Sequence, residues 1–202
     1  MSELGHATPE TPHKYRPIAP PRPTLWPLEM RVLGEGAALA AAWPALDRAP
    51  NGDGHGVIVV PGFSTDDNST VPLRRYIRNR GYHTRGWRNG RNDGPTQANL
   101  DAIVDNAREL ADKTGEKVSL VGWSLGGVLV REAARENADL VRCVITMGSP
   151  FQDVRANSIS IMWNLLASKD RIEDKERTEA LGAPIPVPAT AIFSNTDAIV
   201  AG

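Results

Sequence analysis

The sequence is poor in the residues that build disulfide frameworks, metal centres and membrane spans. It has one cysteine, Cys143, which cannot form an internal disulfide, and its four histidines lack the spacing of metal ligands. The most tempting apolar stretch, residues 36–46, falls well short of the ~20 residues that cross a bilayer. The amino terminus has neither the basic region nor the apolar core of a secretory signal. We therefore expect a cytoplasmic protein with no metal and no stable membrane insertion.

Charge of one sign is also lacking. The 23 Lys and Arg residues and the 24 Asp and Glu residues give a formal net charge of -1, and the two signs are interspersed. Such a pattern provides no electrostatic footprint for nucleic acid, so we do not expect a nucleic-acid partner. The composition leaves the oligomeric state open.

What is present indicates one domain preceded by an arm. A chain of 202 residues with 41% hydrophobic content can build one substantial core but not two. Residues 1–24 contain six prolines and few large apolar side chains, so they cannot bury enough surface to offset the entropy of ordering. We predict a flexible arm over residues 1–24 and one domain over residues 25–202.

Apolar residues alternate between the spacing of strands and the spacing of helices along this domain. Val57 to Val60 is a continuous β-branched run, as expected of a strand that is buried on both faces of a parallel sheet. The predicted strands are residues 57–60, 82–87, 118–121, 141–147 and 189–193, and the predicted helices are 28–46, about 70–80, 100–114 and 125–137. Regular alternation of this kind predicts an α/β fold, with a mostly parallel sheet flanked by helices.

The segment between the last two predicted strands, residues 151–182, is longer than a simple crossover. Its first part carries a helical apolar stripe that includes Trp163, and a mixed-charge run over residues 169–177 follows. One interpretation is a helix packed on the domain, followed by a solvated face. The other is a cap over a functional site, in which Trp163 contacts an apolar substrate.

The stretch LVGWSLGGVL, residues 120–129, places Ser124 between Gly122 and Gly126. A buried strand, the pattern G-x-S-x-G and an amphipathic helix form the context of a nucleophile elbow. The glycines are needed because a sharp strand-to-helix turn brings neighbouring backbone too close for a Cβ. The helix that starts near Leu125 also directs its free N–H groups towards the serine, where an oxyanion would form.

With this elbow, the sequence from Val57 onwards resembles the α/β-hydrolase superfamily, and in particular its bacterial lipase and esterase-like members. The stretch VVPGF, residues 59–63, resembles the oxyanion loop of that family. The resemblance implies that the backbone N–H groups of Phe63 and Leu125 stabilise the oxyanion, and that no cofactor is needed. It also suggests that Trp123, beside the serine, contacts substrate.

The family places its acid and then its histidine after the nucleophile. By this resemblance Asp197 is the acid, and Asp153 is the alternative. No histidine follows Asp197 in the sequence, although the family pattern continues with another helix, another strand and a loop that carries His. We therefore expect an incomplete copy of a hydrolase, which lacks the last strand and helix and leaves an edge exposed near residues 189–193.

The four upstream histidines do not replace the missing base. His55 and His83 precede or begin strands whose opposite ends carry the chemistry, and His6 and His13 lie in the arm. Full triad activity is consequently not expected of this chain, since losing a triad member leaves only ~10³ to 10⁴-fold catalysis over water.

The sequence thus predicts a serine hydrolase that acts on a carboxylic ester or lipid through an acyl-enzyme at Ser124. Two alternatives stay open. The first is a non-catalytic member of the fold that binds a ligand or partner. The second is an acyltransferase that passes the acyl group to an alcohol or amine instead of water.

Overall fold

Strands and helices alternate along the chain as the hydrophobic pattern predicts. The computed structural model describes residues 32–149 and 183–193. In chain order the elements are α1 (Val32–Leu46), β1 (Gly56–Val60), the short 3₁₀ helix η2 (Asp67–Thr70), α2 (Val71–Asn79), β2 (His83–Gly86), α3 (Gln97–Thr114), β3 (Val118–Trp123), α4 (Leu125–Glu136), β4 (Val141–Met147) and β5 (Ala189–Ile192). The predicted strand over residues 141–147 coincides with β4. The predicted α/β class is confirmed.

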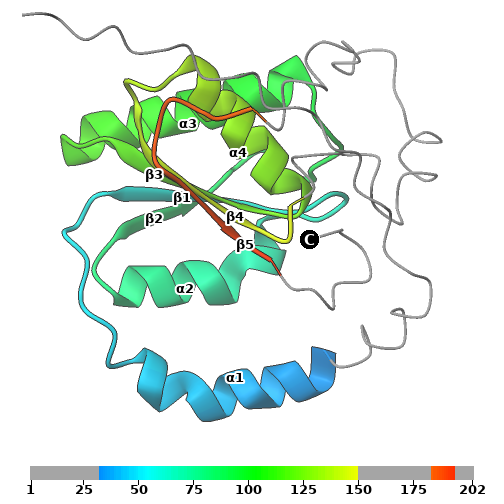
Figure 1. The fold of residues 1–202 in the computed structure, drawn as a ribbon, viewed down its shortest axis with the longest axis vertical. Helices are drawn as coiled ribbons and strands as arrows, with labels where there is room; N and C mark the ends of the chain where they lie inside the picture. The colour runs from blue at the N-terminus through cyan, green and yellow to red at the C-terminus, as the bar shows by residue number, and fades with distance from the viewer. Residues whose placement is uncertain (1–31, 150–182, 194–202) are drawn as a thin grey trace, which may run out of the picture.

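The five strands form one parallel sheet in the order β2-β1-β3-β4-β5 (Figure 1). The chain runs from β1 outwards to β2 and then returns to place β3 on the other side of β1. Val60, the last residue of β1, pairs with Gly122 near the end of β3. The direction in which successive strands are added to the sheet therefore reverses between β1 and β3. Open α/β sheets bind their ligands at the carboxyl ends of the strands at such a point.

Helices cover both faces of the sheet (Figure 1). α3 and α4 lie on one face, and α2 lies on the other. The side chains of β1 alternate between the two sides, with Ile58 and Val60 in the cluster under α3 and α4, and Val57 and Val59 in the cluster on the α2 side. All four are at most 4% exposed, which confirms the prediction of a strand buried on both faces. Each such side chain contributes on the order of 1.5–3 kcal/mol by burial.

The helix α1 lies beyond α2, on the side away from the sheet (Figure 1), and contacts α2 near its own carboxyl end. Trp43 meets Tyr76 of α2 edge to face, with ring centroids 5.9 Å apart, and the Tyr76 hydroxyl donates to the Leu46 carbonyl at 3.1 Å. Leu39 remains 47% exposed. The predicted helix is therefore present from residue 32, but Leu39 and Trp43 are both exposed and do not enter the core.

Several sequence predictions concern residues outside the described ranges. These include the arm over residues 1–24, the segment 151–182 with Trp163, and Asp153 and Asp197. Within the described strands, β5 forms one edge of the sheet and all four of its residues are exposed. In the described ranges, no helix is both long enough and apolar enough to span a bilayer.

Candidate functional site

Ser124 occupies the turn between β3 and α4, at the carboxyl edge of the sheet. Its backbone has φ 52° and ψ -122°, a conformation that side-chain-bearing residues rarely adopt. The turn is held by the Ser124 N–H, which donates to the Met147 carbonyl at 2.8 Å, and by the Gly127 N–H, which donates to the Ser124 carbonyl at 2.9 Å. Strain of this kind costs about 1–3 kcal/mol and persists only where the surroundings enforce it. Ser124 therefore has the backbone geometry of a nucleophile elbow.

The glycines on either side allow this turn. A Cβ on Gly122 would overlap the backbone of Gly126 and Gly127, and a Cβ on Gly126 would overlap the carbonyl oxygens of Val60 and Pro61. These contacts press the start of α4 against the loop that follows β1. The elbow and the VVPGF loop are consequently direct neighbours, although they are far apart in the sequence.

The loop after β1 lies beside the serine. A Cβ built on Gly62 would be 3.4 Å from the Ser124 Cβ. Phe63 follows in a partly buried position, and Leu125, which is 3% exposed, begins α4. The loop and the helix start, which contain the two residues expected to bind an oxyanion, thus come together at Ser124. The donor role of Phe63 and Leu125 remains a prediction.

Trp123 presents an apolar surface next to the serine. It ends β3, pairs with Met147 of β4 and is 42% exposed. A large exposed aromatic at the carboxyl edge agrees with substrate contact, which stays a prediction for this residue. The other expected substrate contact, Trp163, and the expected acid, Asp197, lie outside the described residues.

The two described histidines lie at the opposite edge of the sheet. His55 is 8% exposed, and its Nε2 lies 2.7 Å from the Ser119 Oγ near the start of β3. Ser124 follows the end of that strand, roughly 16 Å away at ~3.3 Å per residue. His83 begins β2 and pairs with Gly56 at the same amino edge. Neither histidine of the described ranges can therefore serve Ser124 as a base.

His55 instead joins a hydrogen-bonded series that sequence reasoning did not find. Its Nδ1 lies 2.5 Å from a carboxylate oxygen of Asp53, and Arg142 contacts the other oxygen at 2.8 Å. The hydrogen bonds from His55 and the charge of Arg142 lower the pKa of Asp53 to about 2. The Asp53–His55 spacing is visible in the sequence NGDGHG, but Ser119 lies 64 residues from His55 and is brought to it only by the register of β1 and β3.

A second loop at the carboxyl edge of the sheet, residues 87–95, follows β2 and packs against the segment after β1. The Asp67 carboxylate accepts hydrogen bonds from the N–H groups of Trp87 and Arg88 at 3.0 and 3.1 Å. The Trp87 side chain is 1% exposed, and its indole N–H donates to the Gly90 carbonyl at 2.9 Å. The segment after β1 is therefore held by hydrogen bonds to the loop after β2 as well as by its packing against the start of α4.

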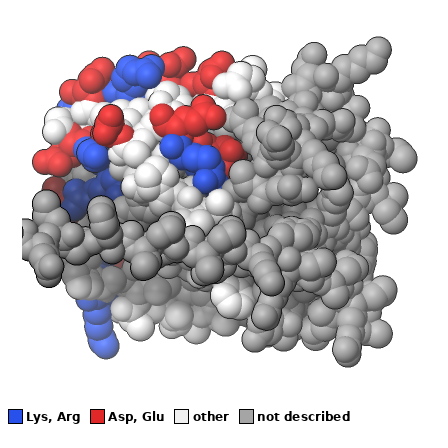
Figure 2. Space-filling view, turned by 45° about the horizontal axis from the view of Figure 1, so that its top comes forward, with Lys and Arg blue, Asp and Glu red and all other residues white. Residues whose placement is uncertain are grey.

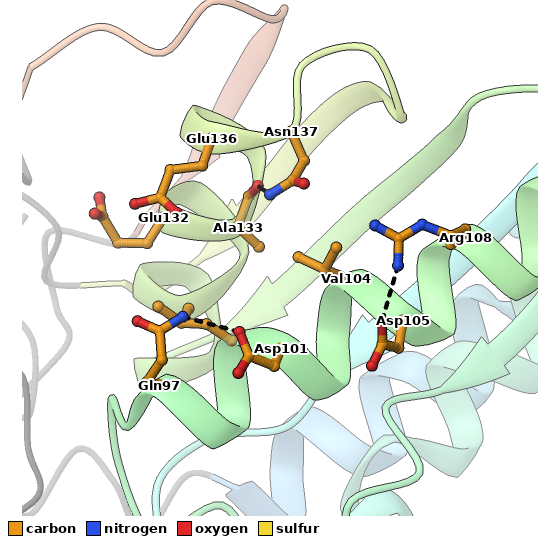
Figure 3. Close-up of a pocket in the computed structure, with 10 residues that line it drawn as sticks. Gln97, Asp101, Val104, Asp105, Arg108, Glu132, Ala133, Glu136 and Asn137 are labelled. Atoms are coloured by element: carbon orange, nitrogen blue, oxygen red, sulfur yellow. Dashed lines mark hydrogen bonds and ion pairs between the residues drawn. The ribbon is translucent and has the colours of Figure 1, made fainter.

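The described surface also holds a groove of about 360 Å³ between α3 and α4 (Figure 3). Its lining includes Asp101, Asp105 and Glu136, and Asp105 is paired with Arg108 at 2.8 Å. Figure 2, in which the top of Figure 1 is turned towards the viewer, shows acidic and basic side chains intermixed on that face. None of the described lining residues belongs to the elbow or to the loop after β1. We therefore separate this groove from the site at Ser124.

Comparison with known families identifies the fold. The sequence profile of the alpha/beta hydrolase fold matches residues 35–199, which is most of the chain. The chain belongs to the α/β-hydrolase family. A search of curated protein sequences finds no significant match. Among the described residues, no group of three or more His, Cys, Asp or Glu side chains could hold a metal ion.

Solved structures of other α/β-hydrolases share the fold at low identity. Aspergillus fumigatus lipase B is 18% identical with a TM-score of 0.53, and the match covers 73% of this chain but 39% of that enzyme. Monoacylglycerol lipase from Paleococcus ferrophilus is 17% identical with a TM-score of 0.51, covering 76% of this chain and 79% of that one. A structure from the study of the metagenome-derived lipolytic enzymes LipS and LipT is 19% identical with a TM-score of 0.52, covering 75% and 76%. This chain thus spans about two fifths of the Aspergillus enzyme.

Proposed function

We propose that this α/β-hydrolase is a serine esterase or lipase that forms an acyl-enzyme on Ser124. The observation that carries the proposal is the strained backbone of Ser124, with φ 52° and ψ -122°, at the carboxyl edge of the sheet. A strained backbone conformation destabilises the fold, and such conformations cluster at functional sites. In a nucleophile elbow, the strained turn is what presents the serine hydroxyl to the substrate. The choice of a carboxylic ester or lipid follows the lipolytic enzymes among the structural relatives and the exposed Trp123 beside the serine.

The chemistry proposed for the site is acyl transfer. The Ser124 Oγ attacks the carbonyl carbon of the ester, and the tetrahedral oxyanion accepts hydrogen bonds from the N–H groups of Phe63 and Leu125. The bond from the carbonyl carbon to the alcohol oxygen then breaks, and the alcohol leaves with the proton that Ser124 has lost. Water attacks the acyl-enzyme, which releases the acid and returns a proton to the Ser124 Oγ. Removing one oxyanion donor typically costs about 10²–10³-fold in rate, so the orientation of the Phe63 N–H should have a large effect on catalysis.

The base is not supplied by either described histidine, because both lie at the amino edge. Asp197 is proposed as the acid that orients a base, on the resemblance to the family order of nucleophile, acid and histidine. The proposal therefore rests on the nucleophile and the backbone donors, which can be tested before the base is identified.

A fluorophosphonate probe tests the proposal directly. A reactive Ser124 forms an Oγ–P bond while the P–F bond breaks, fluoride leaves and the hydroxyl proton passes to a base or to solvent. We expect label on Ser124, identified by peptide mass spectrometry, and no label in Ser124→Ala. The matched control is Ser119→Ala, because Ser119 is the described serine that is hydrogen-bonded to a histidine. Label should persist in that variant.

Each other outcome favours a different function. Label on Ser119 would show that the elbow is not the reactive site. A folded protein that takes no label would support a non-catalytic binding role. If the protein takes the label, and unlabelled protein given an ester substrate forms more new ester or amide than acid when an alcohol or amine is added, the result would indicate an acyltransferase.

A further inference from the structure

The described loop after β2 contains one fully buried polar side chain, Asn92, whose exposure is 0%. Burying an amide costs free energy unless its hydrogen bonds are satisfied. Its Nδ2 donates to the Pro61 carbonyl at 2.8 Å, and its Oδ1 accepts from the Gly94 N–H at 3.2 Å. The side chain thus reaches the loop after β1, 31 residues away in the sequence.

The main chain of Asn92 is hydrogen-bonded to the same loop, at the two residues that follow Phe63. The Ser64 N–H donates to the Asn92 carbonyl at 2.7 Å, and the Asn92 N–H donates to the Thr65 carbonyl at 2.8 Å. Arg91 adds a bond from its Nε to the Ser64 carbonyl at 2.9 Å. Contacts from Asn92 therefore bracket Phe63, with Pro61 before it and Ser64 and Thr65 after it.

Thr65 carries this restraint to the peptide that contains the Phe63 N–H. The Thr65 hydroxyl and N–H both donate to the Gly62 carbonyl, at 2.8 and 3.2 Å. The Gly62–Phe63 peptide is planar, with its C=O and N–H pointing in opposite directions. Fixing the Gly62 carbonyl therefore fixes the direction of the Phe63 N–H.

From these contacts we infer that Asn92 is a positioning residue for the oxyanion hole of Ser124. It does not touch substrate. It sets the orientation of the Phe63 N–H by holding the loop at Pro61, Ser64 and Thr65. This inference rests on the proposed function, since it assigns a catalytic use to the Phe63 N–H.

The sharpest test is Asn92→Asp, which keeps the shape and the Oδ1 acceptor but removes the donor to Pro61. We expect the maximal rate constant of fluorophosphonate labelling to fall about 10–100-fold, because a displacement of ~1 Å at a reacting centre can cost 10²-fold. The apparent affinity for the probe and the final labelled fraction should stay near the wild-type values. A merely structural defect would lower the labelled fraction, not the rate constant.

The pH profile adds a second signature. The carboxyl group that Asn92→Asp introduces regains a donor to the Pro61 carbonyl when it is protonated. The labelling rate of this variant relative to wild type should therefore rise as the pH falls from 8 to 5. Asn137→Asp is the matched control, because the Asn137 Nδ2 also donates to a backbone carbonyl, that of Ala133 at 2.9 Å, but at the carboxyl end of α4, away from both the loop after β1 and the loop after β2. That variant should keep the wild-type labelling rate constant.

A milder variant keeps the test valid if Asn92→Asp does not fold. Arg91→Ala removes an exposed bond to the same loop and should slow labelling about two- to five-fold, in line with the loss of one hydrogen bond. A wild-type rate in folded Asn92→Asp, or in Arg91→Ala if Asn92→Asp does not fold, with Ser124 labelled normally, would overturn the inference alone. An unlabelled wild-type protein would overturn the proposed function and the inference together.

Discussion

Replacement of Gly126 by alanine tests the packing that joins the elbow to the oxyanion loop. Alanine favours a helix over glycine by about 1 kcal/mol, so the change would stabilise α4 if nothing opposed it. The added Cβ, however, overlaps the carbonyl oxygens of Val60 and Pro61, which belong to the backbone and cannot rotate away. Overpacking typically costs about 1–3 kcal/mol, and because the overlap here is with backbone we take the upper part of that range, about 2–3 kcal/mol. We expect the overlap to prevail, with a net loss of about 1–2 kcal/mol.

Thermal or urea unfolding followed by circular dichroism measures this loss. For a domain of this size, a net loss of about 1–2 kcal/mol corresponds to a fall of roughly 2–8 °C in Tm. Gly127→Ala is the comparison variant, since it gains the same helix propensity but its added Cβ overlaps the Ser149 side chain, not the carbonyls of Val60 and Pro61. We expect both variants to lose stability, and only Gly126→Ala to displace the loop after β1.

The functional consequence separates this packing from a general effect on stability. Because the carbonyl groups of Val60 and Pro61, directly before Gly62, must shift to admit the Cβ, Gly126→Ala should also slow fluorophosphonate labelling of Ser124 at temperatures where the protein is folded. A Tm equal to or above that of wild type, or a stability loss with unchanged labelling, would refute the argument that the elbow and the oxyanion loop are held together by backbone contact at Gly126.

Three further predictions address other parts of the molecule. Asp53→Asn should reduce stability at neutral pH. Folding lowers the pKa of the Asp53 carboxyl group from its ordinary value of 3.8 to about 2, so the ionised carboxylate stabilises the fold above pH 3.8, and this stabilisation is lost as the pH falls through about 2. Urea unfolding at pH 7, 4 and 2 should show the gap between the proteins closing at the lowest pH, and a constant gap would contradict this. Thr65→Val removes the hydroxyl bond to the Gly62 carbonyl and should slow Ser124 labelling about two- to ten-fold, whereas an unchanged rate would show that the hydroxyl does not orient this peptide. Added imidazole should accelerate labelling in a concentration-dependent way, since neither described histidine reaches Ser124, and a rate independent of imidazole would point to a base already in place.

The sequence predicted those features that depend on local pattern. The β-branched run at Val57 to Val60 identified β1, and Gly115, with φ 73°, ends α3 as expected of a glycine after an amphipathic run. The elbow was also visible, because its glycines and the flanking apolar segments lie close together in the sequence. The predicted start of α3, at residue 100, is too late, since Thr96, whose side chain accepts from the Asn99 N–H, caps the helix four residues before its first large apolar residue, Leu100.

Features that depend on the register of distant strands could not be predicted in this way. In the sequence, Asn92 is one more polar residue of a turn, and only the fold shows that its amide is buried against Pro61. His55 was correctly placed away from Ser124, but its bond to Ser119 follows from the pairing of β1 with β3. The same limit applies to α1, where helical spacing predicted a helix but not the exposure of Leu39.

The most direct test of the account is the structure of the protein after a phosphonate has reacted with Ser124. The account predicts a covalent bond to the Ser124 Oγ and a phosphonyl oxygen that lies about 2.7–3.1 Å from the backbone nitrogens of Phe63 and Leu125. An adduct whose phosphonyl oxygen points to solvent or contacts neither nitrogen would contradict the assignment of the loop after β1 as the oxyanion hole.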